Sequence, residues 1–211
     1  MSIRVISFDL DGTLVDHHFA DSVWHEGMAE LYAKRYNVDS NEAKERLLSF
    51  YREVGESSLL WYDLTYWFKR LDLPGSPQEL LERFRNRVRV FPEVHEVLKF
   101  LKERSAFKLV LFSNAAREFM EIELQEGKLR EYFSLTISCV SDWGRVKDEN
   151  AYKRLSFVLG VLPKEILHVG DNELFDFLYP KAVGIKTILV DRQNGRLGSV
   201  KNLKELLEIL R

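Results

Sequence analysis

Two aspartates stand directly after a short apolar segment near the start of the chain, and this arrangement constrains the fold more than any other feature. Residues 3–8 are apolar and rich in branched side chains, which is typical of a buried parallel strand. Asp9 and Asp11 follow it, and side chains two residues apart at a strand end point the same way. Gly12 permits the tight turn that comes next. The sequence therefore predicts two neighbouring carboxylates at the end of a buried strand.

Two carboxylates in such a place need a partner, because an unpaired charge is costly where water is scarce. A divalent cation would be one, since hard cations prefer carboxylate oxygens. One aspartate would then attack an electrophile while its neighbour transfers protons. An acidic turn without a ligand is the ordinary alternative for a bare Asp-x-Asp. The longer motif DLDGT, over residues 9–13, is much rarer by chance and favours a functional site.

The rest of the chain divides into a helical stretch and a stretch in which strands alternate with helices. Apolar side chains recur at helical spacing through residues 17–89, which predicts four helices, one of them over residues 60–71, and no strand. Strands that alternate with helices form a parallel sheet covered on both faces. We therefore expect an α/β protein with a core of residues 1–16 and 90–211 and an inserted helical domain of residues 17–89. The core sheet should have about five strands, the first one and four more at residues 108–112, 135–140, 166–169 and 187–190.

Composition and charge narrow the classes of partner. The net charge of −2 gives no global field toward nucleic acid or an anionic membrane. No apolar run is long enough to span a bilayer, and the chain enters its first strand too early for a signal peptide. The single cysteine, Cys139, excludes an internal disulfide and fits a reducing compartment. We expect a cytoplasmic protein, monomeric or homodimeric, that binds neither nucleic acid nor membrane.

Polar side chains collect where the predicted strands end. Ser113 and Asn114 follow the second strand, Lys147 lies in the loop after the third, and Asp171 and Asp176 follow the fourth. Ligands of open parallel sheets bind beyond the carboxyl ends of the strands, so the fold would bring these positions together. Carboxylates suit attack on phosphorus and Mg²⁺ binding, whereas a hydroxyl and an ammonium suit the phosphate oxygens. The set therefore points to phosphoryl transfer.

The motif DLDGTLVD, over residues 9–16, resembles the first motif of the haloacid dehalogenase-like hydrolase superfamily. Ser113 resembles the second motif, a hydroxyl after a strand, and Lys147 in GRVK resembles the third. The segment GDNELFD, over residues 170–176, resembles the fourth. One departure is Asp148, which stands where the family often has proline and leaves Lys153 as a nearby alternative lysine.

The resemblance implies a Rossmann-like core with a C1-type helical cap, and it implies a role for each motif residue. Asp9 would be the nucleophile and a Mg²⁺ ligand. Asp11 would be the general acid and then the base that activates water, with its backbone carbonyl on the metal. The remaining implied roles are phosphate binding for Ser113, Asn114 and Lys147, Mg²⁺ binding for Asp171, and water-mediated binding or orientation of Lys147 for Asp176.

The leading functional hypothesis is a Mg²⁺-dependent phosphatase that hydrolyses a small phosphorylated metabolite through an aspartyl-phosphate. A 2-haloacid dehalogenase is a rival, but halide leaves without a proton and needs no metal, so Asp11 favours phosphate chemistry. A phosphomutase would use the same residues and stays open. A binding protein without enzymatic activity is a further alternative, although such a protein has no use for a proton donor.

Several side chains stay open between a structural and a functional role. His17 and His18 either face the substrate or are exposed linker residues, and residues 55–58 either set specificity or only connect helices. His168 lies inside an apolar strand and is predicted to be a core residue. The aromatic residues of the helical insert either line a pocket or pack in its core: Trp24, Trp61, Tyr62 and Trp67.

Overall fold

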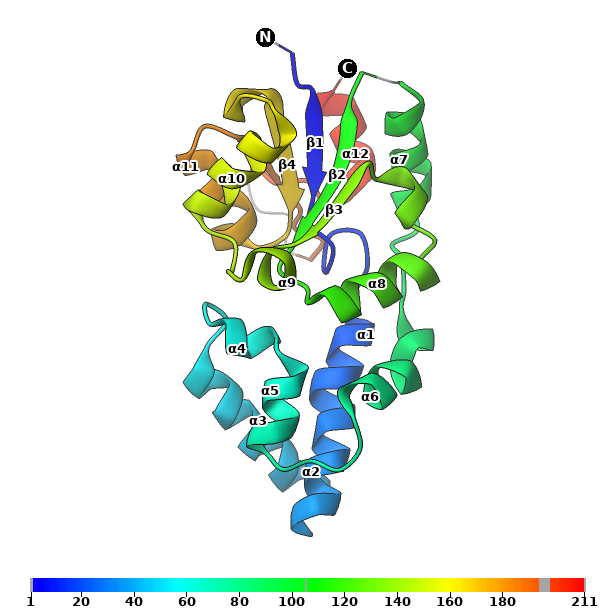
Figure 1. The fold of residues 1–211 in the computed structure, drawn as a ribbon. Coiled ribbons are helices and arrows are strands. Elements are labelled where there is room, and N and C mark those ends of the chain that lie inside the picture. The colour runs from blue at the N-terminus through cyan, green and yellow to red at the C-terminus, as the bar shows by residue number, and fades with distance from the viewer. Residues whose placement is uncertain (1, 105, 194–197, 211) are drawn as a thin grey trace.

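The computed structural model describes residues 2–104, 106–193 and 198–210, and its centre is one parallel sheet (Figure 1). Met1 and Arg211, at the ends of the expected core, lie outside these ranges. The five strands run in the order β3-β2-β1-β4-β5, as in Rossmann-like α/β folds. Their bounds are Val5–Phe8 (β1), Lys108–Ser113 (β2), Leu135–Ser138 (β3), Ile166–Gly170 (β4) and Lys186–Leu189 (β5). The α/β class and the strand number are as the sequence predicts.

The central strand β1 is buried throughout and pairs with β2 and β4. Phe8 is aligned with Leu111 on β2 and with Val169 on β4. All strands are parallel, so their carboxyl ends lie at one edge of the sheet. Asp9 therefore leaves β1 between the ends of its two neighbours, where an open parallel sheet binds its ligands.

Alternate residues of the strands face two different hydrophobic clusters, as the period of two requires. Phe8 and Leu111 belong to the cluster covered by α7 (Val94–Glu103), α8 (Arg117–Glu126) and α12 (Leu203–Ile209). Val5 and Phe112 belong to the opposite cluster. The elements on and around that second face are α9 (Cys139–Trp143), α10 (Glu149–Leu159), η4 (Pro163–Glu165), η5 (Glu173–Leu178) and α11 (Tyr179–Ala182), and η3 (Arg130–Tyr132) precedes β3. Cys139 is buried in this cluster.

Residues 18–87 contribute helices and no strand to the described structure, and they form the lower body in Figure 1. They have a hydrophobic cluster of their own, centred on fully buried side chains such as Trp67 and Leu64. Phe119 on α8 also belongs to it, so α8 packs between the sheet and the helical body. We therefore propose that residues 17–89 form a cap on the core. Its elements are α1 (His18–Asp21), η1 (Ser22–Gly27), α2 (Met28–Tyr36), α3 (Ser40–Val54), α4 (Leu59–Tyr62), α5 (Leu64–Arg70), α6 (Pro77–Phe84) and η2 (Arg85–Arg87).

Two elements differ from what their hydrophobic patterns predict: one helix is divided in two, and one strand is shorter. The helix expected over residues 60–71 is two helices, because Asp63 leaves the helical conformation and its carboxylate accepts a hydrogen bond from the backbone N–H of Tyr66. The strand expected to reach residue 140 stops at Ser138, whose hydroxyl accepts from the N–H of Ser141 and begins α9. In both cases a polar side chain bonds the nearby backbone and outweighs the apolar pattern.

The chain enters and leaves the helical body through two segments that lie side by side. Val15 and Val90 form an isolated antiparallel bridge. The N–H of Asp16 donates to the carbonyl of Arg89 at 2.9 Å, and the N–H of Phe91 donates to the carbonyl of Leu14 at 3.1 Å. The two segments that connect the helical body to the core are thus hydrogen-bonded to each other. In the described part of the chain, no helix is both long and apolar enough to cross a bilayer.

Candidate active site

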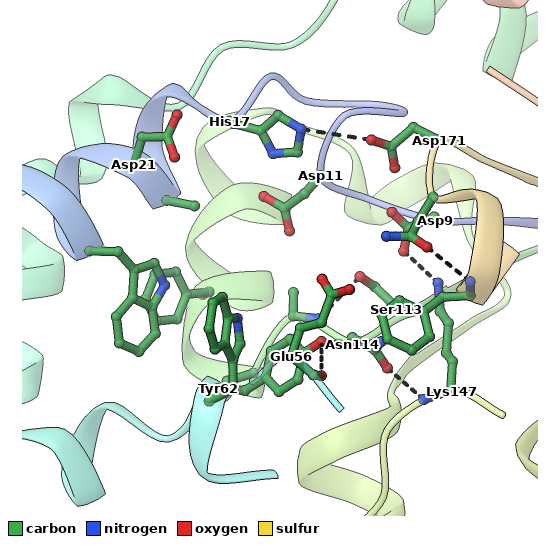
Figure 2. Close-up of a pocket in the computed structure, with 18 of the residues that line it drawn as sticks. Asp9, Asp11, His17, Asp21, Glu56, Tyr62, Ser113, Asn114, Lys147 and Asp171 are labelled. Atoms are coloured by element: carbon green, nitrogen blue, oxygen red, sulfur yellow. Dashed lines mark hydrogen bonds and ion pairs between the residues drawn. The ribbon is translucent and has the colours of Figure 1, made fainter. Parts of the chain in front are cut away.

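The carboxyl ends of the strands and the helical body enclose a cavity of about 340 Å³ (Figure 2). Every site residue predicted from the sequence lines it: Asp9, Asp11, Ser113, Asn114, Lys147, Asp171 and Asp176. The strands position them, because Asp9 follows β1, Ser113 ends β2 and Asp171 follows β4. Residues remote in sequence therefore meet in one place, as the parallel arrangement predicts.

Lys147 is the centre of the charged network. Its side chain is almost fully buried, and its Nζ lies 2.6 Å from Oδ1 of Asp9 and 2.6 Å from Oδ1 of Asp176. Burial opposes the charge of the ammonium, but Asp176 and Asp9 outweigh burial and raise the pKa of Lys147 above its usual range. The structure thus brings Lys147 to Asp9, whereas Lys153 does not line the cavity.

The residues around Lys147 explain how the loop is held. The N–H of Lys147 donates to Oδ1 of Asn114 at 2.8 Å, which ties the loop to the end of β2. Asp148 is the N-cap of α10, and its carboxylate accepts from the N–H of Ala151 at 2.7 Å. Aspartate is favoured at such a cap. The departure at Asp148 thus has a structural role, and it leaves Lys147 in the cavity.

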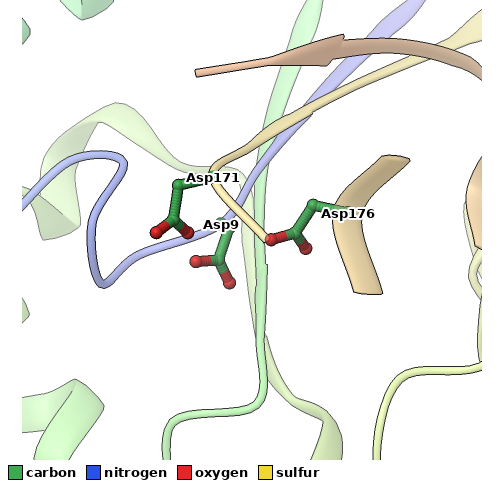
Figure 3. A group of neighbouring side chains, drawn as sticks. All are labelled: Asp9, Asp171 and Asp176. Carbon is green, nitrogen blue, oxygen red and sulfur yellow. The ribbon is translucent and has the colours of Figure 1, made fainter. Parts of the chain in front are cut away.

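Three carboxylates form a cluster beside Lys147 (Figure 3). Asp9, Asp171 and Asp176 each offer an oxygen, and these oxygens lie within 4.8 Å of one another. Burial raises the pKa of Asp9 to about 8; Lys147 lowers it, whereas Asp176 and Asp171 raise it further. Lys147 contacts two of the three carboxylates, those of Asp9 and Asp176. The donors of the cluster are hard oxygens, which fit a Mg²⁺ ion.

Two glycines allow these carboxylates to approach. A Cβ on Gly170 would stand 2.4 Å from Cγ of Asp176. A Cβ on Gly12 would stand 2.1 Å from Oδ2 of Asp171, and Gly12 also has a φ of +72°. Neither contact is possible for a residue with a side chain. The glycines of the first and fourth motifs are therefore required by close packing against the acidic cluster.

Asp176 is held by a buried network that the sequence did not reveal. Its Oδ1 lies 3.0 Å from Nε2 of His168, and its Oδ2 accepts from the N–H of Asn172 at 3.1 Å. Nδ1 of His168 is 3.0 Å from Oγ of Ser7, and the hydroxyl of Tyr152 is 2.9 Å from Nε2. Burial would raise the pKa of Asp176, but Lys147 and His168 outweigh it and lower that pKa.

His168 is buried, as predicted, and it also supports the site. Burial lowers the pKa of its imidazole. The sequence held a signal for this supporting role of His168, because His168 and Ser7 are polar residues inside two apolar strands. They are paired in the sheet, so their side chains lie on the same face.

Asp11 lines the cavity but lies outside the three-carboxylate cluster. Behind it is Glu123 of α8, which is fully buried. Within the described residues, Oδ1 of Asp11 and both carboxylate oxygens of Glu123 have no hydrogen-bond partner. Burial raises the pKa of both groups, and the charge of Asp11 raises that of Glu123 further. Sequence reasoning missed Glu123, although an acidic residue among the buried Phe119, Met120 and Leu124 was a signal.

The helical body supplies the other wall of the cavity. Trp24, Trp61 and Tyr62 line it, whereas Trp67 packs in the hydrophobic cluster. The amide of Asn114 lies 3.5 Å from the hydroxyl of Tyr62 and links this wall to the sheet. Further residues of the helical body in the lining are Ala20, Asp21, His25, Tyr51 and Glu56.

The two histidines after the first motif have different surroundings. His17 lines the cavity, and its Nε2 lies 3.7 Å from Oδ2 of Asp171. The neighbouring carboxylate of Asp171 raises the pKa of His17 to about 9; burial lowers it, and the charge of Asp11 adds to the rise. Nε2 of His18 lies 3.3 Å from Nη1 of Arg87, and His18 is not part of the lining. His17 thus faces the site.

Comparison with known proteins gives one consistent result. The family model described as haloacid dehalogenase-like hydrolase matches residues 3–184. Among curated proteins, the GMP/IMP nucleotidase YrfG of Escherichia coli (strain K12) is 24% identical over 173 residues, covering 81% of this chain and 75% of that protein. The glyceraldehyde 3-phosphate phosphatase of Pyrococcus furiosus is 27% identical over 197 residues, covering 88% of this chain and 80% of that protein.

Solved structures agree with this result. A HAD phosphatase from Thermococcus onnurineus superposes with a TM-score of 0.86 and 26% identity, covering 99% of this chain and 98% of that chain. A 2-haloacid dehalogenase from Pseudomonas syringae pv. Tomato DC3000 superposes with a TM-score of 0.72 and 22% identity, covering 99% of this chain and 98% of that chain. At that identity the second likeness shows the fold alone.

Proposed function

The chain belongs to the haloacid dehalogenase-like hydrolase family, and we propose that it is a Mg²⁺-dependent phosphatase that hydrolyses a small phosphorylated metabolite through an aspartyl-phosphate. One observation carries the proposal. Asp9 is held at 2.6 Å by Lys147 inside a three-carboxylate cluster, and Asp11 lines the same cavity. The phosphatases and the nucleotidase among its relatives support it.

The proposed reaction has two steps. Lys147 holds Oδ1 of Asp9, and the other carboxylate oxygen attacks phosphorus. The bond from phosphorus to the substrate alcohol breaks, and Asp11 gives its proton to the alcohol oxygen. Water then attacks the phosphorus of the aspartyl-phosphate and passes a proton to Asp11. The bond from phosphorus to the carboxylate of Asp9 breaks, which frees Asp9 and inorganic phosphate. Ser113, Asn114 and Lys147 bind the phosphate oxygens in both steps.

Mg²⁺ would be held by the side chains of Asp9 and Asp171 and by the backbone carbonyl of Asp11. Asp176 would bind it through water or orient Lys147, to which it already bonds. When bound, the ion supplies positive charge that balances the carboxylates and the phosphoryl oxygens. The hard-oxygen cluster of three carboxylates beside one lysine supports this assignment.

The rival reactions differ in what they need from Asp11. A 2-haloacid dehalogenase releases halide, which needs no proton, so the presence of Asp11 in the cavity favours the phosphatase. A phosphomutase would use the same residues but would return the phosphoryl group to a sugar instead of to water. Release of inorganic phosphate without a second substrate distinguishes a phosphatase from a mutase. A protein that only binds its ligand would release none.

We further propose that the protein acts in the cytoplasm as a monomer or homodimer. The free, buried Cys139 fits a reducing compartment. Its small net charge of −2 gives no reason to expect nucleic acid as a partner.

The test combines a metal requirement with detection of the intermediate. Hydrolysis of p-nitrophenyl phosphate should require Mg²⁺ and stop in excess EDTA. Asp9→Asn should abolish turnover, and brief reaction of the unmodified protein should add phosphate to the peptide that contains Asp9. Asp171→Ala should weaken Mg²⁺ binding in a calorimetric titration.

Asp72→Asn, at an exposed cap position with a φ of +45° that asparagine accepts, is the matched control. Full activity without metal, or phosphate on Ser113, contradicts the proposal.

A further inference from the structure

Both walls of the cavity carry carboxylates. The wall at the sheet edge holds the proposed phosphate ligands, including Lys147. The opposite wall contributes the carboxylates of Asp21 and Glu56. Among the residues that the structure describes, Lys147 is the only lysine or arginine in the lining, and Asp9 and Asp176 already bond to it. His17 and His25 also line the cavity, and they lie 3.7 Å from Asp171 and Asp21, respectively. A second anionic group on a substrate would therefore meet carboxylates, while the lysine and the histidines of the described lining each have an aspartate beside them.

Glu56 is the acidic residue of the opposite wall that has no ion-pair partner in the described structure. Oδ1 of Asp21 lies 3.7 Å from Nε2 of His25, so Asp21 has a neighbouring imidazole. In the described structure, no cationic side chain forms an ion pair with Glu56, although its carboxylate points into the cavity toward Ser113 (Figure 2). The carboxylate of Glu56 is thus available to a ligand.

A turn and a hydrogen bond fix the backbone at Glu56, which suits recognition of a ligand by its carboxylate. Gly55 ends α3 with a φ of +73°, which turns the chain toward the site. The hydroxyl of Tyr62 donates to the carbonyl of Glu56 at 3.0 Å and lies 3.5 Å from the amide of Asn114. Glu56 is therefore linked through one tyrosine to the end of β2, where the phosphate is proposed to bind.

Aromatic rings line the same cavity. Trp24 stacks on Phe119 with an interplanar angle of 2° and a centroid distance of 5.6 Å, which fixes its orientation. Trp61 and Tyr51 meet edge to face at 6.0 Å. Aromatic faces beside a carboxylate attract amines and quaternary ammonium groups, because the ring quadrupole and the carboxylate favour the same charge.

We propose that Glu56, with the aromatic rings that line the same cavity, binds a positively charged amino or ammonium group on the alcohol part of the substrate. The substrate class is then a small phosphomonoester of an amino alcohol, which combines a phosphate at one end with a cation at the other. This inference rests on the proposed phosphatase function. Phosphomonoesters that carry a carboxylate or a second phosphate should be poor substrates of the same site.

The experiment compares substrates that are matched in size. O-phosphoethanolamine and propyl phosphate differ by an ammonium in place of a methyl group, and phosphocholine and phosphoglycolate extend the series to a quaternary cation and an anion. A lost hydrogen bond to a charged group typically lowers binding by about tenfold or more. We expect kcat/KM for phosphoethanolamine to exceed that for propyl phosphate by about tenfold or more.

Variants assign that preference to Glu56. Glu56→Gln should bring the ratio of the two kcat/KM values close to one, and Glu56→Lys should reverse the preference in favour of phosphoglycolate. Glu45→Gln removes the same charge from an exposed position of α3 outside the cavity and should leave the ratio unchanged. A thermal melt of each variant shows that it is folded.

Each other outcome overturns the inference. Equal rates for phosphoethanolamine and propyl phosphate in the unmodified protein refute it while leaving the phosphatase function intact. An equal fall for both substrates in Glu56→Gln refutes it as well, because Glu56 would then only hold the wall in place. If p-nitrophenyl phosphate and every alkyl phosphate remain unhydrolysed in Mg²⁺, the proposed function fails and the inference fails with it.

Discussion

Replacement of Gly170 by alanine tests whether the acidic cluster is packed as tightly as the structure shows. The new Cβ would stand 2.4 Å from Cγ and 2.6 Å from Oδ2 of Asp176, whereas ordinary contacts begin near 3.4 Å. Asp176 would have to retreat by about 1 Å, given that contact limit. A displacement of that size away from Lys147 would lengthen the 2.6 Å contact beyond hydrogen-bond range.

The expected losses follow from that displacement. Crowding in a packed interior costs about 1–3 kcal/mol, and a weakened hydrogen bond between charged groups adds about 1.5–3 kcal/mol. Partial relaxation should leave a net loss of about 2–4 kcal/mol in the free energy of unfolding. For a chain of this length, each kcal/mol lowers the melting midpoint by about 2–4 °C, so the midpoint should fall by about 4–16 °C. Misplacement of Lys147 against Asp9 by a similar distance should lower kcat/KM by about 10²-fold.

The assay is a thermal melt combined with p-nitrophenyl phosphate kinetics on the same preparation. Gly160→Ala is the control, because Gly160 ends α10 with a φ of +63° and a Cβ there meets nothing within 4 Å. The control should lose about 1 kcal/mol through backbone strain and keep its activity. If Gly170→Ala melts within about 1 °C of the unmodified protein and keeps kcat/KM within about twofold, Asp176 is not confined by Gly170 and the reasoning fails.

Two further predictions concern single groups of the site. Asp11→Asn should slow hydrolysis of alkyl phosphates by about 10²–10⁴-fold. It should slow the first step with an aryl phosphate much less, so phosphorylated protein should accumulate with the aryl substrate and be visible by mass. Equal slowing of both substrates would remove Asp11 as the proton donor. The pKa of His17 is raised to about 9, so its protonated form should stabilise the fold fully below about pH 6.5 and lose this effect as pH rises through 9. The melting difference between the unmodified protein and His17→Gln, measured without Mg²⁺, should shrink over that interval, and a difference independent of pH would contradict this.

The fold and the outline of the site were predictable because both depend on local patterns. Strands that alternate with helices indicate a parallel sheet, and a parallel sheet brings Asp9, Ser113 and Asp171 to one edge wherever they occur in the chain. Lys147 could be predicted only in the context of the other motifs, because a lysine in a loop is ordinarily a solvated surface residue. These inferences require the order of elements and the direction of strands, and no knowledge of how individual side chains pack.

The supporting residues could not be predicted in the same way. Glu123 lies behind Asp11 only because α8 packs between the sheet and the helical body. His168 meets Asp176 because a π-helical turn, η5, follows β4 and brings the carboxylate back over the strand. The backbone of Glu56 is held by the hydroxyl of Tyr62, six residues further along the chain. Such contacts arise from tertiary packing, for which hydrophobic periodicity carries no information.

The bridge between Val15 and Val90, with the hydrogen bonds of their neighbours, would allow the helical body to be exchanged as a unit. Because its entry and exit are adjacent, a short turn between Asp16 and Arg89 would close the core with little loop entropy, and the strand order around β1 would not change. The proposed chemistry of the sheet edge and the proposed choice of substrate would then be separable in one gene. On this proposal, a different insert grafted at the same two positions would change the leaving group that is accepted while Asp9 and Lys147 stay in place.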